Sequence, residues 1–180
     1  FQGIAGSYSE VALRKFFENK EVTPCGFPHS QQVFDALEKK EIDAVIIPVE
    51  NSIAGNVSIN TDLLFSSSVT IVGEAYLHIK HHLLGLPNTK IDEIRTVHSH
   101  PIALAQCQDF FFEKGIQQIP DFDTAGSCKY ISELNDPSVA AVGSILCAEY
   151  YNLKVLSDDI QHQKDNFTRF QVLTHQDHRP

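Results

Sequence analysis

The chain has 180 residues, an apolar fraction of 42% and a formal net charge of −9 at pH 7. This length suffices for one large domain or two small lobes. No apolar run approaches the roughly 20 residues that a membrane-spanning helix needs. Lys and Arg are scattered without a basic stripe, so the sequence argues against a membrane span and against nucleic acid as a partner.

No basic segment followed by an apolar stretch marks a signal peptide. We therefore expect a cytoplasmic protein, with a plastid location left open because a transit peptide can be removed. The four cysteines contain no C-x-x-C pair. We interpret Cys25, Cys107, Cys128 and Cys147 as buried free thiols of a reducing compartment, not as a disulfide framework.

In chain order, residues 1–3 ("FQG") indicate the end of a strand. Ser7-x-x-Glu10 is a capping box and predicts a helix that begins there. Residues 29–40 predict a second helix, with Val33, Phe34 and Leu37 facing inward. The remaining segments up to residue 85 are a near-continuous apolar run typical of a buried parallel strand (42–50), a short helix (61–65), and one long strand or two (69–85).

After Gly85 the alternation begins again. Pro101 suits the first turn of a helix and Gly115 suits its end, so residues 100–115 predict one helix. The other predicted helices cover residues 124–136 and 144–152. Strands are predicted over residues 94–99, 116–122, 138–143, 153–157 and 169–175, and residues 176–180 are expected to form a tail or linker.

Strands that alternate with helices predict α/β layers with largely parallel sheets. The rhythm resets near residue 78, which suggests two α/β lobes. We assign residues 1–77 and 160–180 to the first lobe and residues 78–159 to the second. The last strand can complete the sheet of the first lobe, and a cleft between the lobes is a natural ligand site.

Four stretches follow predicted strands, where ligands of such folds bind. Each can also be an ordinary strand–helix turn. "GIAGSYSE" and "PVENSIAGNV" follow strands of the first lobe, and "HSHPIALAQC" and "DTAGSCK" belong to the second. Their candidate ligand-binding residues are Ala5, Ser7, Tyr8, Glu50, Asn51, Ser52, Ser99, Thr124, Ala125, Gly126 and Ser127. Gln106 lies about two turns into its helix, where such a residue is more often solvated.

The sequence lacks the motifs of several common kinds of enzyme site. The histidines show no H-E-x-x-H spacing, which argues against a metal site. No G-x-S-x-G elbow is present for a hydrolase serine. Neither G-x-G-x-x-G nor a Walker loop occurs, which argues against dinucleotides and nucleoside triphosphates.

The stretch "KDNFTRF", residues 164–170, has two interpretations. It can be a turn entering a strand, with Asn166 in the turn and Phe167 and Phe170 in the core. Alternatively, its Asn, Thr and Arg carry function.

Taken together, "NFTRF", "VENSIAGNV", "HSHPIALAQC", "GIAGSYSE" and "DTAGSCK" resemble, in order and spacing, the catalytic domain of prephenate dehydratase. The resemblance covers essentially the whole chain. It implies two α/β lobes like those of a type II periplasmic binding protein, with the active site in the cleft between them. It also implies conversion of prephenate to phenylpyruvate, water and carbon dioxide, as a lyase of phenylalanine biosynthesis.

By this resemblance Thr168 is the catalytic threonine, and Asn166, Arg169 and Phe170 complete its motif. Glu50, Asn51 and Ser52 line the cleft, and Ser99 and Gln106 match family positions tied to substrate binding or catalysis. Thr124 to Ser127 hold a carboxylate through backbone N–H groups. Arg169 either binds substrate or pairs with a carboxylate to support the fold.

The resemblance implies no metal and no organic cofactor, and a homo-oligomer, either a dimer or a tetramer. Family members commonly carry a C-terminal ACT domain that binds phenylalanine, and none is expected within these 180 residues. Two alternatives remain: arogenate dehydratase, which uses the amino-acid analogue, and a non-catalytic small-molecule-binding module on the same fold.

Overall fold

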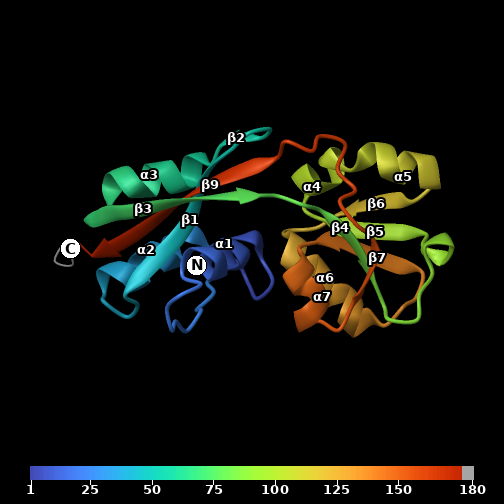
Figure 1. Ribbon diagram of the computed structural model, residues 1–180, viewed down its shortest axis with the longest axis horizontal. Coiled ribbons are helices and arrows are strands. Elements are labelled where there is room, and N and C mark those ends of the chain that lie inside the picture. Colours follow the sequence, from blue (N-terminus) through green and yellow to red (C-terminus); the bar gives the residue numbers. More distant parts are fainter. Residues whose placement is uncertain (176–180) are drawn as a thin grey trace. The chain divides into compact units, whose positions relative to one another are not determined.

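The computed structural model describes residues 1–175, so the tail expected at residues 176–180 lies outside the described part. The chain forms two compact units (Figure 1). We call the first unit residues 1–4 and 8–79 together with the described residues from Asp165 onward. The second unit consists of Ala5–Ser7 and Lys80–Lys164.

The first unit is built around a four-stranded sheet in the order β2-β1-β9-β3. Its strands are β1 (Ala44–Asn51), β2 (Gly55–Asn56), β3 (Val69–His78) and β9 (Phe167–His175), and its helices are α1 (Tyr8–Phe16), α2 (Ser30–Glu38) and α3 (Ser58–Ser66). The C-terminal strand β9 lies between β1 and β3, and every pairing in the sheet is antiparallel (Figure 1). The last strand therefore completes this sheet, as the sequence indicated.

Helices cover both faces of this sheet. Val33, Phe34 and Leu37 of α2 pack with Leu63 of α3 and with Leu173 of β9 on one face, as the periodicity of residues 29–40 predicted. On the other face, the core consists of Phe1, Ala12, Ile46, Leu77, Ile79, Phe170 and Val172. Alternate residues of β9 thus enter two different cores, as the period of two along a strand requires.

The direction predicted for residues 42–50 is wrong, because β1 pairs antiparallel with both of its neighbours. The apolar run that suggested a parallel strand has another cause. Ile46 faces the core beneath α1, and Val45 and Ile47 face the core beneath α2. A strand covered by helices on both faces is apolar throughout, whichever way its partners run.

The second unit contains a mixed five-stranded sheet in the order β6-β5-β7-β4-β8. Its strands are β4 (His82–Gly85), β5 (Thr96–Ser99), β6 (Gln117–Pro120), β7 (Val139–Gly143) and β8 (Lys154–Ser157). β5 is parallel to β6 and β7, whereas β4 is antiparallel to β7 and β8. The expectation of largely parallel sheets therefore holds for only part of this unit.

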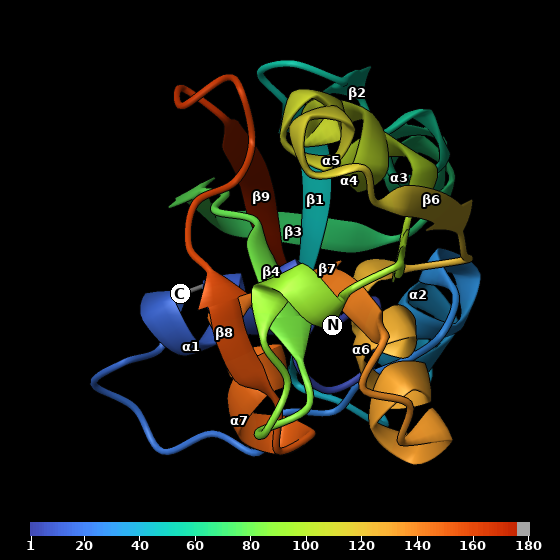
Figure 2. The same cartoon turned by 90° about the vertical axis from the view of Figure 1, so that its right-hand side faces the viewer.

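The helices of the second unit lie on both sides of its sheet, with α4 and α5 on one side and α6 and α7 on the other (Figure 2). They are α4 (Pro101–Gln106), α5 (Gln108–Lys114), α6 (Thr124–Leu134) and α7 (Ile145–Tyr150), with a 3-10 turn at Ile91–Glu93. The helix predicted over residues 100–115 is divided at Cys107. Gly115 adopts a left-handed conformation (φ 66°) where α5 ends, in agreement with the sequence.

Three other expectations are corrected. Residues 1–3 make a single bridge, between Gln2 and Phe27, and not a strand. Cys25 is exposed, whereas the other three cysteines are buried, and all four are free.

The lobe boundaries also differ from those predicted, since residues 160–164 belong to the second unit. The N–H of Ile160 bonds the carbonyl of His81, and that of His162 bonds the carbonyl of Gln106. These bonds attach the polar stretch before β9 to the second unit.

Phe170 is the largest side chain that β9 contributes to the core, with an exposed fraction of 1%. We predict that Phe170→Ala lowers the free energy of unfolding by about 3–5 kcal/mol, because it leaves a cavity between the sheet and α1. Urea titration followed by circular dichroism measures this change. Phe65→Ala, at a side chain that is 88% exposed, is the matched control and should change stability by less than about 0.5 kcal/mol. Equal losses in the two variants would contradict this description of the core.

Candidate active site

Asn51 and Thr168 lie directly opposite each other where β1 and β9 meet. The Asn51 amide nitrogen donates to the Thr168 hydroxyl oxygen at 2.9 Å and to Asn166 Oδ1 at 2.8 Å. The Asn51 amide oxygen accepts from the backbone N–H groups of Ile53 (3.0 Å) and Ala54 (2.8 Å). Asn51 therefore joins the segment after β1 to the start of β9.

These contacts fix the direction of the Thr168 hydroxyl. Backbone N–H groups can only donate, so the Asn51 oxygen must face Ile53 and Ala54 and its nitrogen must face Thr168. The hydroxyl oxygen accepts that bond, and its proton is directed elsewhere. Within residues 1–175, Asn51 is the one hydrogen-bond partner that the Thr168 hydroxyl has, although this residue is only 8% exposed.

Ser52 and Asn166 fix the backbone around this pair. The Ser52 hydroxyl donates to the carbonyl of Asp165 at 3.1 Å and accepts from the N–H of Phe167 at 2.9 Å. The carbonyl of Asn166 accepts from the N–H of Ile79 at 2.7 Å. Asn166 is fully buried, so the turn residue expected at this position is also part of the polar network.

Arg169 pairs with two carboxylates. Its guanidinium lies 3.3 Å from a carboxylate oxygen of Glu50 and 3.3 Å from one of Glu74. Glu50 is directly opposite Arg169 on β1, and Glu74 is on β3. Of the two roles left open by the sequence, the structure contains the pairing with carboxylates. Phe170 is in the core, while Phe167 is 42% exposed and stacks on His78.

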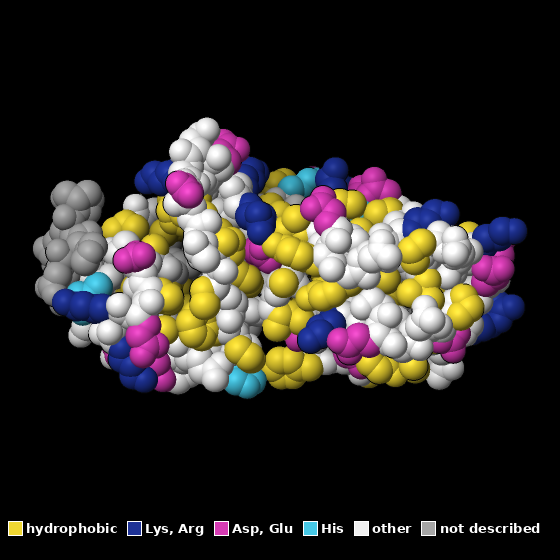
Figure 3. Space-filling view, turned by 90° about the horizontal axis from the view of Figure 1, so that it is seen from below, with side chains coloured by type: hydrophobic (Ala, Val, Ile, Leu, Met, Phe, Trp, Pro, Cys, Tyr) yellow, Lys and Arg dark blue, Asp and Glu magenta, His cyan; other side chains and the backbone are white. Residues whose placement is uncertain are grey.

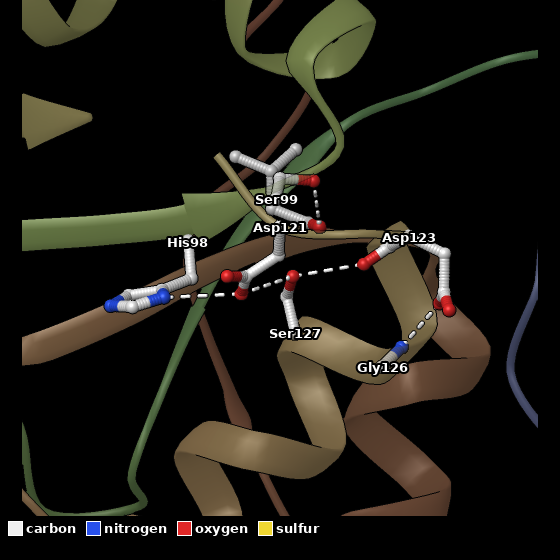
Figure 4. A network of polar contacts seen from close by, with 7 residues as sticks. His98, Ser99, Asp121, Asp123, Gly126 and Ser127 are labelled. Carbon is white, nitrogen blue, oxygen red and sulfur yellow. Dashed lines mark hydrogen bonds and ion pairs between the residues drawn. The ribbon is translucent and has the colours of Figure 1, made fainter. Parts of the chain in front are cut away.

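In the second unit, Asp123 occupies the start of α6. Its carboxylate accepts from the N–H of Gly126 at 2.5 Å (Figure 4). This N–H belongs to the group that we expected to hold a substrate carboxylate. A bound anion would have to share the helix terminus with Asp123, so only the N–H groups of Thr124 and Ala125 are candidates there.

Ser127 and Ser99 are used inside the second unit. Ser127 Oγ lies 2.9 Å from both Asp121 Oδ2 and the Asp123 carbonyl oxygen, and Asp121 Oδ2 also lies 3.1 Å from His98 Nδ1 (Figure 4). The side chains of this network line a hollow together with Phe122, Gly126 and Tyr130. Ser99 is fully buried and donates to the carbonyl of Val142.

Gln106 is held by two histidines that the motif analysis did not select. Its side-chain oxygen lies 2.8 Å from His81 Nε2, and its carbonyl accepts from His162 Nδ1 at 2.8 Å. Burial lowers the pKa of His81 to about 4, so this ring is neutral at pH 7. The amide oxygen can only accept, so the single ring proton of His81 is on Nε2. The only feature of the sequence that could have pointed to His81 is the histidine-rich run of residues 78–82.

The candidate residues thus form separate groups. Residues 50–52 and 166–170 come together in the first unit. Ser99 and residues 124–127 lie near one another in the second unit, and Gln106 forms its own cluster with His81 and His162. Ala5 and Ser7 belong to the second unit, and Tyr8 begins α1 in the first. Within residues 1–175, no group of three His, Cys, Asp or Glu side chains is placed to hold a metal ion.

The family model for prephenate dehydratase matches residues 1–178 of the chain. The chain belongs to the prephenate dehydratase family. Members of this family are carbon–oxygen lyases of phenylalanine biosynthesis. No helix between residues 1 and 175 combines the length and the apolar character that a bilayer crossing requires.

Curated relatives from plants are similar over nearly the whole chain. The chain is 40% identical over 173 residues to arogenate dehydratase 2 of Petunia hybrida, with 96% of this chain and 43% of the relative covered. It is also 40% identical to arogenate dehydratase/prephenate dehydratase 1, chloroplastic, of Arabidopsis thaliana, with 96% and 44% covered. The chain therefore spans less than half the length of these relatives.

Two solved structures are similar over nearly the whole chain. A prephenate dehydratase from Arthrobacter aurescens, in complex with L-Phe, is 28% identical and has a TM-score of 0.86, with 97% of this chain and 59% of that chain covered. A protein described as a novel type of quorum quenching acylase is 32% identical with a TM-score of 0.90, and 100% and 63% are covered.

More distant structures share the fold alone. A nutrient-binding protein from Burkholderia cenocepacia, bound to methionine, is 13% identical with a TM-score of 0.53, and 98% of this chain and 84% of that chain are covered. The mixed α/β fold with two sheets is thus that of type II periplasmic binding proteins, as the resemblance implied.

The buried His81 makes stability depend on pH. The ordinary histidine pKa of 6.5 applies to the unfolded chain, and burial lowers the folded value to about 4 despite the hydrogen bond to Gln106. Between these values the unfolded state binds a proton that the folded state does not, so stability falls as pH falls from 6.5 to 4 and no further below. We predict that from pH 7 to pH 5 the wild type loses about 2 kcal/mol more unfolding free energy than His81→Gln.

Urea titration of both proteins at the two pH values measures this difference, and the other titrating groups cancel in the comparison. Parallel losses in the wild type and the variant would show that His81 is not held neutral.

Proposed function

We propose that this domain catalyses the decarboxylating dehydration of prephenate to phenylpyruvate, water and carbon dioxide. The proposal rests on one observation above the others. Asn51 donates to the Thr168 hydroxyl oxygen, which leaves the hydroxyl proton available to an incoming group. Asn51 and Thr168 lie in the two segments that carry the strongest resemblance to the family.

The chemistry needs such a donor. The ring carboxylate of prephenate leaves as carbon dioxide, and the electron pair of the broken carbon–carbon bond enters the ring. The ring becomes aromatic as the carbon–oxygen bond of the ring hydroxyl breaks and that oxygen leaves as water after gaining a proton. A hydroxyl placed against the departing oxygen assists this step by donating a hydrogen bond or a proton.

Positioning contributes more than acidity in this proposal, because threonine is a very weak acid. The bond from Asn51 is already made before substrate binds, so no reorganisation is needed at the moment of reaction. Asn51 is itself fixed by two backbone N–H groups. In this mechanism Thr168 is the catalytic residue and Asn51 positions it.

Arg169 is proposed to support this arrangement and not to bind the substrate as a free cation. Its charge is shared between Glu50 and Glu74, at 3.3 Å each. A substrate carboxylate would have to compete with two carboxylates for the same guanidinium. The N–H groups of Thr124 and Ala125 in the first turn of α6 are the remaining candidates for binding an anion.

Arogenate is the alternative substrate, because the curated relatives include arogenate dehydratases. It differs from prephenate by an ammonium group in place of the side-chain keto group. Both substrates lose the same ring groups, so the role proposed for Thr168 is the same for each. The ratio of kcat/KM for the two compounds, measured by formation of phenylpyruvate and of phenylalanine, decides between them.

Two other functions are less well supported. A binding module of this fold would not need a hydroxyl whose direction is fixed. An acylase needs a nucleophile hydrogen-bonded to a base. Within residues 1–175 the hydroxyl of Thr168 contacts an amide and not a base, so Thr168 is not placed to act as the nucleophile of an acylase.

Removal of the hydroxyl tests the mechanism. We predict that Thr168→Ala lowers kcat by roughly 10²–10⁴ with a small change in KM, because the lost interaction belongs mainly to the transition state. Ultraviolet absorbance of phenylpyruvate gives both constants. Thr168→Ser, which keeps the hydroxyl, is the matched control and should retain most of the activity. Near-normal turnover by Thr168→Ala would exclude Thr168 as the donor.

Charge leads to a second prediction. The protein carries −9 and prephenate carries two negative charges, so long-range electrostatics oppose their encounter. On the face drawn in Figure 3, Lys and Arg side chains are interspersed with Asp and Glu. Moderate salt screens the long-range repulsion more than it weakens short desolvated contacts. We therefore predict that kcat/KM is flat or rises slightly from low to physiological ionic strength, as measured by steady-state kinetics at constant oligomeric state. A steep fall would reveal a long-range positive funnel.

A further inference from the structure

The segment Ala5–Ser7 belongs to the second unit, although the residues on both sides of it belong to the first. The covalent connections to residues 4 and 8 therefore do not explain why this segment belongs to the second unit. Its place there depends on noncovalent contacts. The segment also contains Ala5 and Ser7, two of the residues expected to bind the substrate.

Three side chains along α7 and its flanks supply those contacts. The Ser144 hydroxyl donates to the carbonyl of Gly6 at 2.6 Å, and the Cys147 thiol donates to the same carbonyl at 3.2 Å. The Tyr151 hydroxyl donates to the carbonyl of Ala5 at 2.6 Å. Positions 144, 147 and 151 are three and four residues apart, which places them on one face of the helix.

The Ser144 side chain contacts Gly6 and does not cap the helix that Ser144 begins. Serine at the N-cap of a helix commonly accepts a hydrogen bond from a backbone N–H of the first turn. Ser144 is the N-cap of α7, yet its side chain makes no such bond. Ser144 is 2% exposed, and its hydroxyl donates to the carbonyl of Gly6, 138 residues away in the chain.

Gly6 permits the close approach. Its φ of +88° is a conformation that residues with side chains rarely adopt. A Cβ at this position would lie 2.8 Å from the Cys147 sulfur and 3.2 Å from the Cys147 Cα. The segment can therefore lie this close to α7 only with glycine at its centre.

We propose that Ser144, Cys147 and Tyr151 are positioning residues that hold Ala5–Ser7 against α7 in the conformation that binds the substrate. This inference rests on the function proposed above. The segment has no regular secondary structure of its own. When the contacts with α7 are lost, the entropy cost of ordering the segment is transferred to substrate binding, which raises KM.

The test combines hydrogen exchange with kinetics. Tyr151→Phe removes one hydroxyl and keeps the ring. The matched control is Tyr76→Phe, because Tyr76 is 58% exposed and its hydroxyl has no hydrogen-bond partner among residues 1–175. Deuterium uptake of a peptide spanning residues 2–8 is measured without substrate. KM and kcat are then measured with prephenate and with arogenate.

For Tyr151→Phe we expect exchange in this peptide to be roughly five- to tenfold faster, the change that loss of one hydrogen bond produces. KM should rise by a similar factor with kcat within about twofold, because uniform binding is lost. Adding Ser144→Ala should increase both effects, and Tyr76→Phe should change neither.

Unchanged exchange in Tyr151→Phe would overturn the proposal that α7 holds the segment. Faster exchange with unchanged KM in an active enzyme would overturn its link to substrate binding. If the wild type converts neither compound, the dehydratase function fails, and the exchange comparison still decides whether α7 holds the segment.

Discussion

The pairing of β9 between β1 and β3 is the constraint on which the first unit depends. Without β9 the sheet would have no central strand, because β1 and β3 contact each other only through it. The same pairing places Thr168 opposite Asn51. Core formation and the polar network of the candidate site therefore have one structural cause. The strand that brings its phenylalanine into the core also brings its threonine to the amide that orients it.

The sequence predicted the elements better than their directions. Helical periodicity and turn residues identified α1, α2 and α6, because these signals depend on local geometry. Strand direction depends on which distant segment pairs with which. Nothing in the run around Ile46 and Ile47 distinguishes a parallel partner from an antiparallel one once helices cover both faces. Pairing with distant segments also divides residues 69–85 between two sheets, because β3 pairs with β9 whereas β4 pairs with β7 and β8.

The candidate site was predicted in composition but not in geometry. The motifs contained Asn51 and Thr168, yet the contact between them spans 117 residues in the chain. The motifs also suggested an anion site at the start of α6, where Asp123 already occupies one N–H. His81 and His162 were missed because each is linked to the candidate site only by a hydrogen bond to Gln106. Contacts between residues so far apart in the chain produce no sequence motif of fixed spacing.

The buried polar groups around Thr168 limit how this site can vary. Asn166 and Thr168 are almost inaccessible to water, and each has a hydrogen bond to the amide of Asn51. Leaving a buried polar group unpaired costs about 1–3 kcal/mol. Replacement of Asn51 by an apolar residue would deprive both partners of that amide at once, and the backbone N–H groups of Ile53 and Ala54 as well. The direction of the threonine hydroxyl is thus maintained by the same bonds that stabilise the end of the sheet, so geometry at this site and stability of the first unit change together.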